Sequence, residues 1–485
     1  MSKAAVLDAS RPEFDQVIQD IVDYVMTYDV TQSGTAMETA RYCWMDTIGC
    51  GLLALNYPAC TKLLGPVVPG AGMNNGSRVP GTSYELDPVR AAWNIGTMVR
   101  WLDFNDTWLA AEWGHPSDNL GAILALADFQ SLQCIARGET PLTMKDVLIA
   151  MIQAHEVQGV IALENCFNRV GLDHVVLVRI ASTAVTARML GCNRDEALNA
   201  VSHAWIDGSS LRTYRHAPNT GSRKSWAAGD ASSRGLFLAL MAQRGEMGYP
   251  SAITAPTWGF QDVSFRGKDL VFNHPYATYT MENILFKISF PAEFHAQTAV
   301  EAAITLHGRM QKQGNSLEDI QSILIETQES ADRIINKTGP LDNPADRDHC
   351  IQYMVAVALI TGSLGAEDYE DNVATDPRID QLRDKMRLKE NKRFTREYLE
   401  ADKRAIGNAI AITFADGSSI KETVDYPVGH RRRREEGIPL LKEKFERYLR
   451  GRLSHKNAEA VLEVCASQGS FERTRVNDMM DLFVV

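Results

Sequence analysis

The 485-residue sequence has few of the features that mark metal centres, nucleotide sites or membrane spans. Its eight cysteines are scattered and form no C-x-x-C pair, which argues against zinc, an iron–sulfur cluster and a redox dithiol. The glycine patterns of phosphate-binding loops are missing too. No stretch has about 18 consecutive apolar residues, and Met1 to Pro12 lacks the apolar or Arg-rich run of a targeting segment. We therefore expect a cytoplasmic protein with no membrane partner, no metal and no cofactor.

Positive charge is also scarce. The sequence has 50 Lys and Arg against 61 Asp and Glu, which gives a formal net charge of -11. The dense basic run at 431–434 is followed at once by Glu435 and Glu436, a pattern typical of a solvated turn. Because nucleic-acid binding needs a basic face, this charge balance argues against a nucleic-acid partner.

Length and periodicity predict a mainly α protein with two domains. One hydrophobic core stops growing at roughly 250–300 residues, so a chain of this length divides. Apolar residues recur at helical spacing from Phe14 to Met26, and Thr143 with Asp146 has the spacing of a capping box. Ser117 is a candidate cap for another helix. We expect no strand before about residue 275.

The pattern changes after Tyr279. Three segments have the composition of strands: 322–325, 409–414 and 419–424. Asp416-Gly417 between the last two is a hairpin turn signal, so a smaller α+β domain is expected here. The segments 438–449 and 457–464 return to helical spacing and are expected to pack on the first domain.

Groups that transfer protons or bind anions are concentrated in a few segments. Asp103, Thr107 and His115 lie around a turn that leads into a helix, whose free backbone N–H groups favour an anion. A surface loop with capping residues is an equally good interpretation of this segment alone. His174 precedes an apolar helix, where a lone histidine is more often structural.

Five basic side chains gather in the Gly-, Ser- and Asn-rich segment 207–224: Arg212, Arg215, His216, Arg223 and Lys224. In an acidic protein this cluster favours a polyanionic ligand, because Arg binds a carboxylate in bidentate fashion and Lys supplies a point charge. A solvated loop is the alternative, since charge clusters also occur in structural networks.

Lys287 lies inside an otherwise apolar run, where a lysine either extends outward to solvent or is partly buried with a lowered pKa. His295 begins the next expected helix, and Arg347, His349 and Tyr353 precede another. Such groups supply cations for carboxylates, a base for a carbon-bound proton and an acid for a departing hydroxide. These are the requirements for eliminating water from a β-hydroxy tricarboxylate, a reaction that needs no metal if the carboxylates are neutralised.

Four segments carry a resemblance to the MmgE/PrpD family: 100–118, 210–230, 282–298 and 344–353. The likeness covers nearly the whole chain. It implies a large all-helical domain at 1–279, completed by helices at 434–485, and a smaller inserted α+β lid domain at 280–433. It also implies an active site between the two domains and a homodimer.

The resemblance implies an activity as well: elimination of water from 2-methylcitrate to give 2-methyl-cis-aconitate in the methylcitrate cycle of propionate catabolism, without an iron–sulfur cluster. Citrate and cis-aconitate are candidates for a side activity. The family's active-site positions fall on Asp103, Thr107, His115, His174, Lys224 and Lys287. The candidates for substrate binding are Arg212, Arg215, His216, Arg223, Glu293, His295, Arg347 and Tyr353.

Two alternatives to this reaction stay open. The family includes cis-aconitate decarboxylases, but two extra residues between Thr107 and His115, and Glu293 after the segment 290–292, resemble the dehydratase branch. Either Glu293 or His295 takes the place of the decarboxylase histidine. The other alternative is a carboxylate-binding protein of the same fold that has lost activity.

Overall fold

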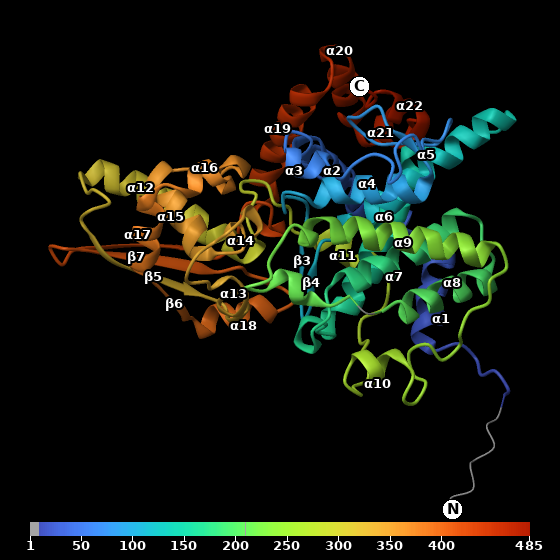
Figure 1. Cartoon of the computed structure of the whole chain (residues 1–485), viewed down its shortest axis with the longest axis horizontal. Helices are drawn as coiled ribbons and strands as arrows, with labels where there is room; N and C mark the ends of the chain where they lie inside the picture. Colours follow the sequence, from blue (N-terminus) through green and yellow to red (C-terminus); the bar gives the residue numbers. More distant parts are fainter. Residues whose placement is uncertain (1–8, 209) are drawn as a thin grey trace, which may run out of the picture.

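The computed structural model describes residues 9–208 and 210–485, and these residues are mainly α-helical (Figure 1). Residues 1–8 and Ser209 lie outside the described residues. Residues 1–8 begin both the expected first domain and the segment 1–12, which lacks a targeting pattern. Ser209 belongs to the basic segment 207–224. Buried hydrophobic side chains form two large clusters. We call the parts around them the helical body and the sheet body.

The helical body combines the first part of the chain with its last helices, as the blue-to-green and red ribbons of Figure 1 show. Its helices are α1 (Gln16–Thr27), α2 (Gly34–Ala54), α3 (Pro58–Thr61), α4 (Pro88–Arg100), α5 (Leu120–Arg137), α6 (Met144–Glu164), α7 (Val175–Met189), α8 (Arg194–Ile206), α9 (Arg223–Gln243), α10 (Phe260–Ser264), α11 (Tyr279–Asn283), α19 (Arg434–Arg452), α20 (His455–Cys465), α21 (Gln468–Arg473) and α22 (Val476–Asp481). The predicted return of the carboxyl-terminal helices is confirmed, because Leu441 and Phe445 are buried in the first cluster.

Local sequence accounts for several of these helices. The apolar pattern at 14–26 forms α1, and the Asp146 carboxylate accepts the Thr143 N–H at 2.8 Å, as a capping box requires. The cap expected at Ser117 is wrong. Ser117 lies inside the 3-10 turn η2 (Pro116–Asn119), which runs directly into α5, and its hydroxyl donates to Asp106 Oδ1 at 2.6 Å.

The sheet body is built on four strands in the order β6-β5-β7-β8. They are β5 (Ile320–Thr327), β6 (Met386–Glu390), β7 (Asn408–Phe414) and β8 (Ser419–Val424). Its helices are α12 (Gln297–Gln313), α13 (Glu329–Ile335), α14 (Pro344–Arg347), α15 (Ile351–Thr361), α16 (Asp371–Ala374), α17 (Pro377–Asp384) and α18 (Lys392–Leu399). The predicted hairpin is confirmed: β7 and β8 pair antiparallel, and Gly417 has the left-handed φ of 85° that such a turn needs.

The sequence missed one strand of this sheet, and one expectation about strands is wrong. β6 had no signal because it is short and polar, and it pairs in parallel with β5 at one edge of the sheet. Strands also occur before residue 275, but each has two residues, too few for an alternating pattern. They are β1 (Ser77–Arg78), β2 (Glu85–Leu86), β3 (Trp108–Leu109) and β4 (Trp113–Gly114).

The two bodies meet around the β3–β4 hairpin. Leu109 and Trp113 leave the helical body at this hairpin and are buried in the hydrophobic cluster of the sheet body. Thr107, next to β3, exchanges backbone hydrogen bonds with Leu285 at 2.8 and 3.0 Å. This contact places the hairpin beside the segment that contains Lys287.

Helix α6 is the one helix among the described residues that is long and apolar enough to span a membrane. Of its most apolar window, 83% is buried inside the protein. It therefore serves as a core helix of the helical body.

Candidate functional site

Asp103 is the centre of a buried group of charges at the seam of the two bodies. It follows the end of α4 and has a left-handed φ of 49°, which aspartate tolerates better than most residues. Its Oδ1 lies 2.8 Å from Arg100 Nη1. Lys287 Nζ donates to the same Oδ1 and, at 2.8 Å, to the Asp103 carbonyl. One carboxylate oxygen thus accepts from two cations that come from segments far apart in the chain.

Lys224 and the 348–349 pair approach the other oxygen of Asp103. Lys224 Nζ, at the start of α9, lies 3.9 Å from Asp103 Oδ2, and His349 Nε2 lies 3.8 Å from it. Lys224 donates to both oxygens of Asp348 at 2.9 and 2.7 Å. The His349 Nδ1–H donates to Asp348 Oδ1 at 2.7 Å. This arrangement alternates cations and carboxylates across the seam.

His115 faces the same charges with one free ring nitrogen. Its Nδ1 lies 2.7 Å from the backbone carbonyl of Asp106, and a carbonyl only accepts, so Nδ1 carries the proton. Burial, together with the positive charges of Arg100 and Lys287, holds the pKa of His115 well below its usual value. The ring is therefore neutral, and Nε2, 3.7 Å from Asp103 Oδ1, has an available lone pair.

A second charged group lies beside His115. The rings of His174 and His115 are 5.5 Å apart between centroids, and neither nitrogen of His174 makes a hydrogen bond to the part of the chain that the structure describes. Arg215 Nε donates to Asp173 Oδ2. Within residues 9–208 and 210–485, three buried guanidinium nitrogens have no hydrogen-bond partner: Arg215 Nη2, and Nε and Nη1 of Arg212. Buried guanidinium N–H groups are normally paired, so these atoms are suited to an anionic ligand.

These side chains enclose a cavity of about 20 Å³. Its polar lining residues are Arg100, Asp103, Thr107, His115, His174, Arg212, Arg215, Lys287, Glu293 and His349. This volume is close to the space that one water molecule needs, and it is far below the roughly 300 Å³ or more of ordinary ligand pockets. The cavity is thus closed in this structure.

A larger cavity of about 360 Å³ lies next to it along the seam. Lys224 and Asp348 line this second cavity, and so do the apolar side chains of Trp101, Leu102 and Ala345. The Lys224–Asp348 ion pair, which also contacts Asp103 and His349, therefore lies between the two cavities.

The electrostatic balance favours a charged Asp103. Burial by itself raises the pKa of the Asp103 carboxyl, but the positive charges of Arg100 and Lys287 outweigh burial and hold this pKa well below its usual range. Burial lowers the pKa of both Lys224 and Lys287, against the attraction of Asp348 and Asp103. The site thus combines a stable anion with ammonium groups that release a proton more easily than exposed lysines.

Five of the eight expected binding residues lie outside this cavity. Arg223 is exposed, pairs with Asp230 and packs over a tryptophan ring, and His216 is exposed as well. Arg347 donates to the Tyr369 carbonyl, and the Tyr353 hydroxyl donates to the Asp368 carbonyl, so both hold the backbone of the sheet body. His295 lies behind Glu293 and hydrogen-bonds to its Oε1 at 2.8 Å.

The sequence alone predicts no role for four titratable residues of the site. They are Arg100 and His349, which line the cavity, and Asp173 and Asp348. Asp173 and Asp348 each precede a histidine of the site and neutralise an Arg or a Lys that comes from another segment. An acid directly before a candidate histidine was the available signal for both.

Among the described residues, Asp103, Asp348 and His349 offer three ligand atoms within 4.8 Å of one another, a spacing that a metal ion could use. In this structure Lys224 and Lys287 donate to the same carboxylates. The donor set is therefore already neutralised by ammonium groups. The expectation of a metal-free site stays a prediction.

Comparisons with known proteins extend over nearly the whole chain. Residues 19–273 match the MmgE/PrpD N-terminal domain, and residues 290–468 match the MmgE/PrpD C-terminal domain. A protein of Escherichia coli K12 named 2-methylcitrate dehydratase is 62% identical over 99% of this chain and 100% of its own length. One of the same name from Cupriavidus necator is 63% identical over 98% and 99%, and a mitochondrial one from Yarrowia lipolytica is 59% identical over 98% and 92%.

Proposed function

From the premise that this chain belongs to the MmgE/PrpD family, we propose that the closed cavity beside Asp103 is its active site. The reaction of the chain is the dehydration of 2-methylcitrate, a small tricarboxylate, because relatives of that name are 62–63% identical over nearly their whole length. The observation that carries the placement of the site is a neutral His115 beside guanidinium N–H groups that have no hydrogen-bond partner among the described residues.

The reaction breaks two bonds and forms one π bond. A base takes the proton from the methyl-bearing carbon, which is next to a carboxylate, and the hydroxyl leaves from the neighbouring carbon. The hydroxide takes a proton from an acid and departs as water, which leaves 2-methyl-cis-aconitate. No electron acceptor is required, and the stabilisation of negative charge on the carboxylate is the main electrostatic demand.

The roles follow from which atoms are free. His115 Nε2 has a lone pair in the cavity and is proposed as the base. Arg212 and Arg215 have unpaired N–H groups for the substrate carboxylates. Lys224 and Lys287, whose pKa values burial lowers, neutralise a carboxylate and supply the proton for the departing hydroxide. Asp103 holds both lysines in place.

The sheet body is proposed as a lid, with the domain limits expected from the sequence: 1–279 with 434–485, and 280–433. Support comes from the closed cavity, which is too small for a tricarboxylate. The cavity of about 360 Å³ beyond the Lys224–Asp348 pair marks a route of access along the seam. A cytoplasmic homodimer that works without an iron–sulfur cluster is proposed on the basis of the family resemblance.

The test is an assay of purified, chelator-treated protein with 2-methylcitrate and, separately, with citrate. We expect the ultraviolet absorbance of a conjugated double bond to appear with 2-methylcitrate, with no release of carbon dioxide. Carbon dioxide released from cis-aconitate would favour the decarboxylase alternative, and no product from any of the acids would favour a silent binding protein. Turnover that iron restores after chelation would contradict the metal-free mechanism.

A further inference from the structure

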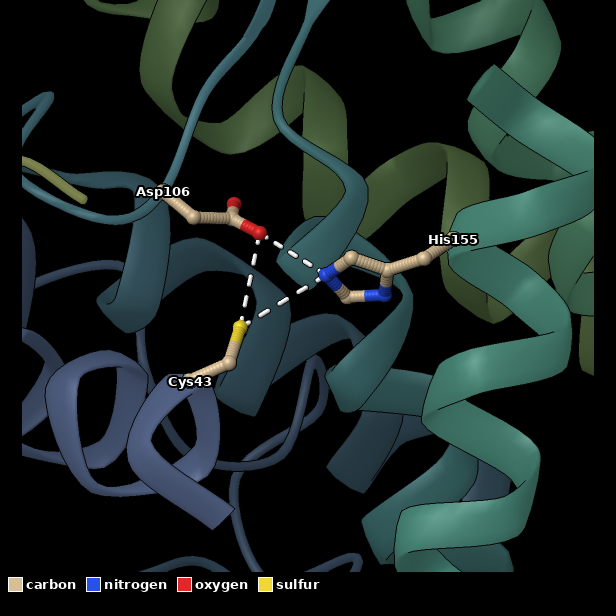
Figure 2. A group of neighbouring side chains, drawn as sticks. All are labelled: Cys43, Asp106 and His155. Carbon is tan, nitrogen blue, oxygen red and sulfur yellow. Dashed lines mark hydrogen bonds and ion pairs between the residues drawn. The ribbon is translucent and has the colours of Figure 1, made fainter. Parts of the chain in front are cut away.

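Behind the proposed active site, three buried side chains converge from separate elements (Figure 2). Cys43 comes from α2, His155 from α6, and Asp106 from the segment between α4 and β3. Asp106 Oδ2 lies 2.8 Å from His155 Nε2 and 3.4 Å from Cys43 Sγ, and Cys43 Sγ lies 3.5 Å from His155 Nε2. These side chains are 0 or 1% exposed, so solvent does not compete for their hydrogen bonds.

The hydrogen bonds determine how many protons this group holds. His155 Nδ1 lies 2.8 Å from the Met151 carbonyl, which only accepts, so Nδ1 carries a proton. The contact between Nε2 and Asp106 Oδ2 then contains a second proton, and the pair is neutral overall whichever atom holds it. Cys43 donates its S–H to the same Asp106 oxygen.

The other oxygen of Asp106 anchors the segment just after His115. Asp106 Oδ1 accepts the Ser117 hydroxyl at 2.6 Å and the Ser117 backbone N–H at 3.1 Å. The backbone N–H expected to be free for an anion is therefore used inside the protein. A metal at Cys43, Asp106 and His155 would have to displace the proton between His155 and Asp106 and the S–H proton of Cys43, so the group is better suited to holding Asp106.

The backbone of Asp106 connects this group to the reaction. Its carbonyl oxygen accepts the Nδ1–H of His115 at 2.7 Å, the bond that leaves Nε2 of His115 free. The next residue, Thr107, is hydrogen-bonded through its backbone to Leu285. With its side chain and the following peptide both held, the Asp106 carbonyl has one orientation.

We propose that Asp106 is the positioning residue of His115: clamped by His155, Cys43 and Ser117, its carbonyl holds His115 in the Nδ1–H tautomer with Nε2 toward the substrate. The inference rests on the proposed function in assigning His115 the role of base. The geometry of the clamp itself is independent of that assignment. Asp106 touches neither the cavity nor the reacting atoms.

The test compares Asp106→Asn with Asp128→Asn in the full chain. Asn keeps the size of the side chain, but its NH₂ group is a donor and must face either the Ser117 donors or His155. Because two donors cannot hydrogen-bond to each other, one of these contacts is lost. Asp128 is equally buried and pairs with Arg78 away from the cavity, which makes it a matched control for the loss of a buried carboxylate. We expect kcat of Asp106→Asn to fall about 10- to 100-fold with KM nearly unchanged, because displacement by about 1 Å costs on this scale.

The decisive readout is the ring-nitrogen NMR spectrum of histidine-labelled protein, with the His115 signals assigned from a His115→Gln spectrum. Wild type and Asp128→Asn should show a proton-bearing Nδ1 and an unprotonated Nε2 at His115, and Asp106→Asn should lose this pattern. If Asp106→Asn retains both the pattern and kcat, or if Asp128→Asn loses them to the same extent, the proposal is wrong.

Ser117→Ala is the milder variant for the case in which Asp106→Asn does not fold, because it removes a single hydroxyl from the clamp. It should shift the same nitrogen signals and lower kcat by a smaller factor, and an unchanged spectrum would overturn the proposal. The failure of the proposed function is distinguishable: if His115→Ala keeps its kcat, His115 is not the base, whereas the tautomer measurement still reports on the clamp.

Discussion

At the scale of single residues, the site depends on the difference between charged and neutral groups that are equally buried. Asp103 keeps its charge because cations surround it, and His115 stays neutral because burial and the same cations disfavour its protonated form. This pair places a neutral histidine, the proposed base His115, next to a permanent anion, Asp103. Three predictions belong to this scale.

His115→Ala should lower kcat by two or more orders of magnitude, since general acid–base catalysis typically contributes about 10²- to 10⁴-fold. The reason is the loss of Nε2, the free nitrogen that faces the cavity. Steady-state kinetics with 2-methylcitrate measure the effect. A rate close to that of the wild type would remove His115 from the mechanism.

Lys224→Met should mainly damage substrate binding and the stabilisation of transition-state charge, so kcat/KM should fall. Met keeps most of the length of the side chain but removes the ammonium group that pairs with Asp348 and contacts Asp103. Arg223→Met is a control one residue away, because Arg223 is exposed and lies outside the cavity. An unchanged kcat/KM in Lys224→Met would contradict the placement of this lysine.

Glu112→Gln should change how stability depends on pH. Burial raises the pKa of Glu112 to about 7 in the folded protein, from a model-compound value of 4.5. Its stabilising contribution is therefore complete below pH 4.5 and is lost as the pH rises through about 7. Relative to the Gln variant, the wild type should lose up to about 3 kcal/mol of unfolding free energy over this window, a loss that urea unfolding at several pH values detects. Parallel stability curves would contradict it.

At the scale of elements, the packing of α4 against α9 determines how Arg100 and Lys224 are spaced. A Cβ on Gly229 would lie 2.4 Å from the Trp93 carbonyl and 2.7 Å from Thr97 Oγ1, so the two helices are in backbone contact. Arg100 ends α4, and Lys224 is the second residue of α9. The glycine thus allows the close approach that brings both cations to Asp103.

Gly229→Ala should force α4 and α9 apart, lower the unfolding free energy by about 1–3 kcal/mol and reduce kcat/KM. Gly308→Ala is the matched control. Gly308 lies in the helix α12, and a Cβ at this position has no neighbouring atom within 4 Å. This substitution should raise stability by about 0.5–1 kcal/mol and leave activity unchanged. Thermal unfolding and kinetics of both variants are the measurements. Equal effects of the two substitutions would show that helix spacing is not limiting.

At the scale of the whole molecule, the proposed lid predicts that the two bodies separate to admit a tricarboxylate, which is too large for the cavity beside Asp103. Propane-1,2,3-tricarboxylate, which lacks the hydroxyl and cannot be dehydrated, should bind without reacting. It should slow amide hydrogen exchange in 212–224 and 341–350, which line the seam, and not in α20. At about 100 times its Kd it should stabilise the protein by about 2.7 kcal/mol. Uniform or absent protection would argue against closure at this seam.

The fold was largely predictable because most of its signals are local. Helical periodicity, the capping box at Thr143 and the Asp416-Gly417 turn each involve residues within a few positions of one another. The edge strand β6 gave no such signal, since its polar residues need little burial and its partner β5 is distant in the chain. The relation between the two bodies likewise depends on packing between distant segments.

The candidate site was predictable as a set of segments but less so as a set of atoms. Arg212 and Arg223 belong to one basic segment, yet the first is buried in the cavity and the second is exposed on α9. No sequence rule separates them, because α9 begins at Arg223 whereas Arg212 lies in the preceding 3-10 turn, and packing gives the two side chains different surroundings. Arg347 and Tyr353 were expected to bind substrate for their chemistry, and instead they hydrogen-bond to backbone carbonyls of their own body.

By itself, the sequence determined the helical class, the position of the later strands and the family to which the chain belongs. Periodicity, turn residues and long motifs are all local properties of the sequence, so no tertiary structure is needed to identify them. Only the tertiary structure decided that Lys287 is buried against Asp103 rather than extended into solvent, and that His115 is neutral with Nε2 free. The physical reason is that burial and charge are properties of three-dimensional surroundings. Asp103 and Lys287 are 184 positions apart, and no local pattern reports how close they lie.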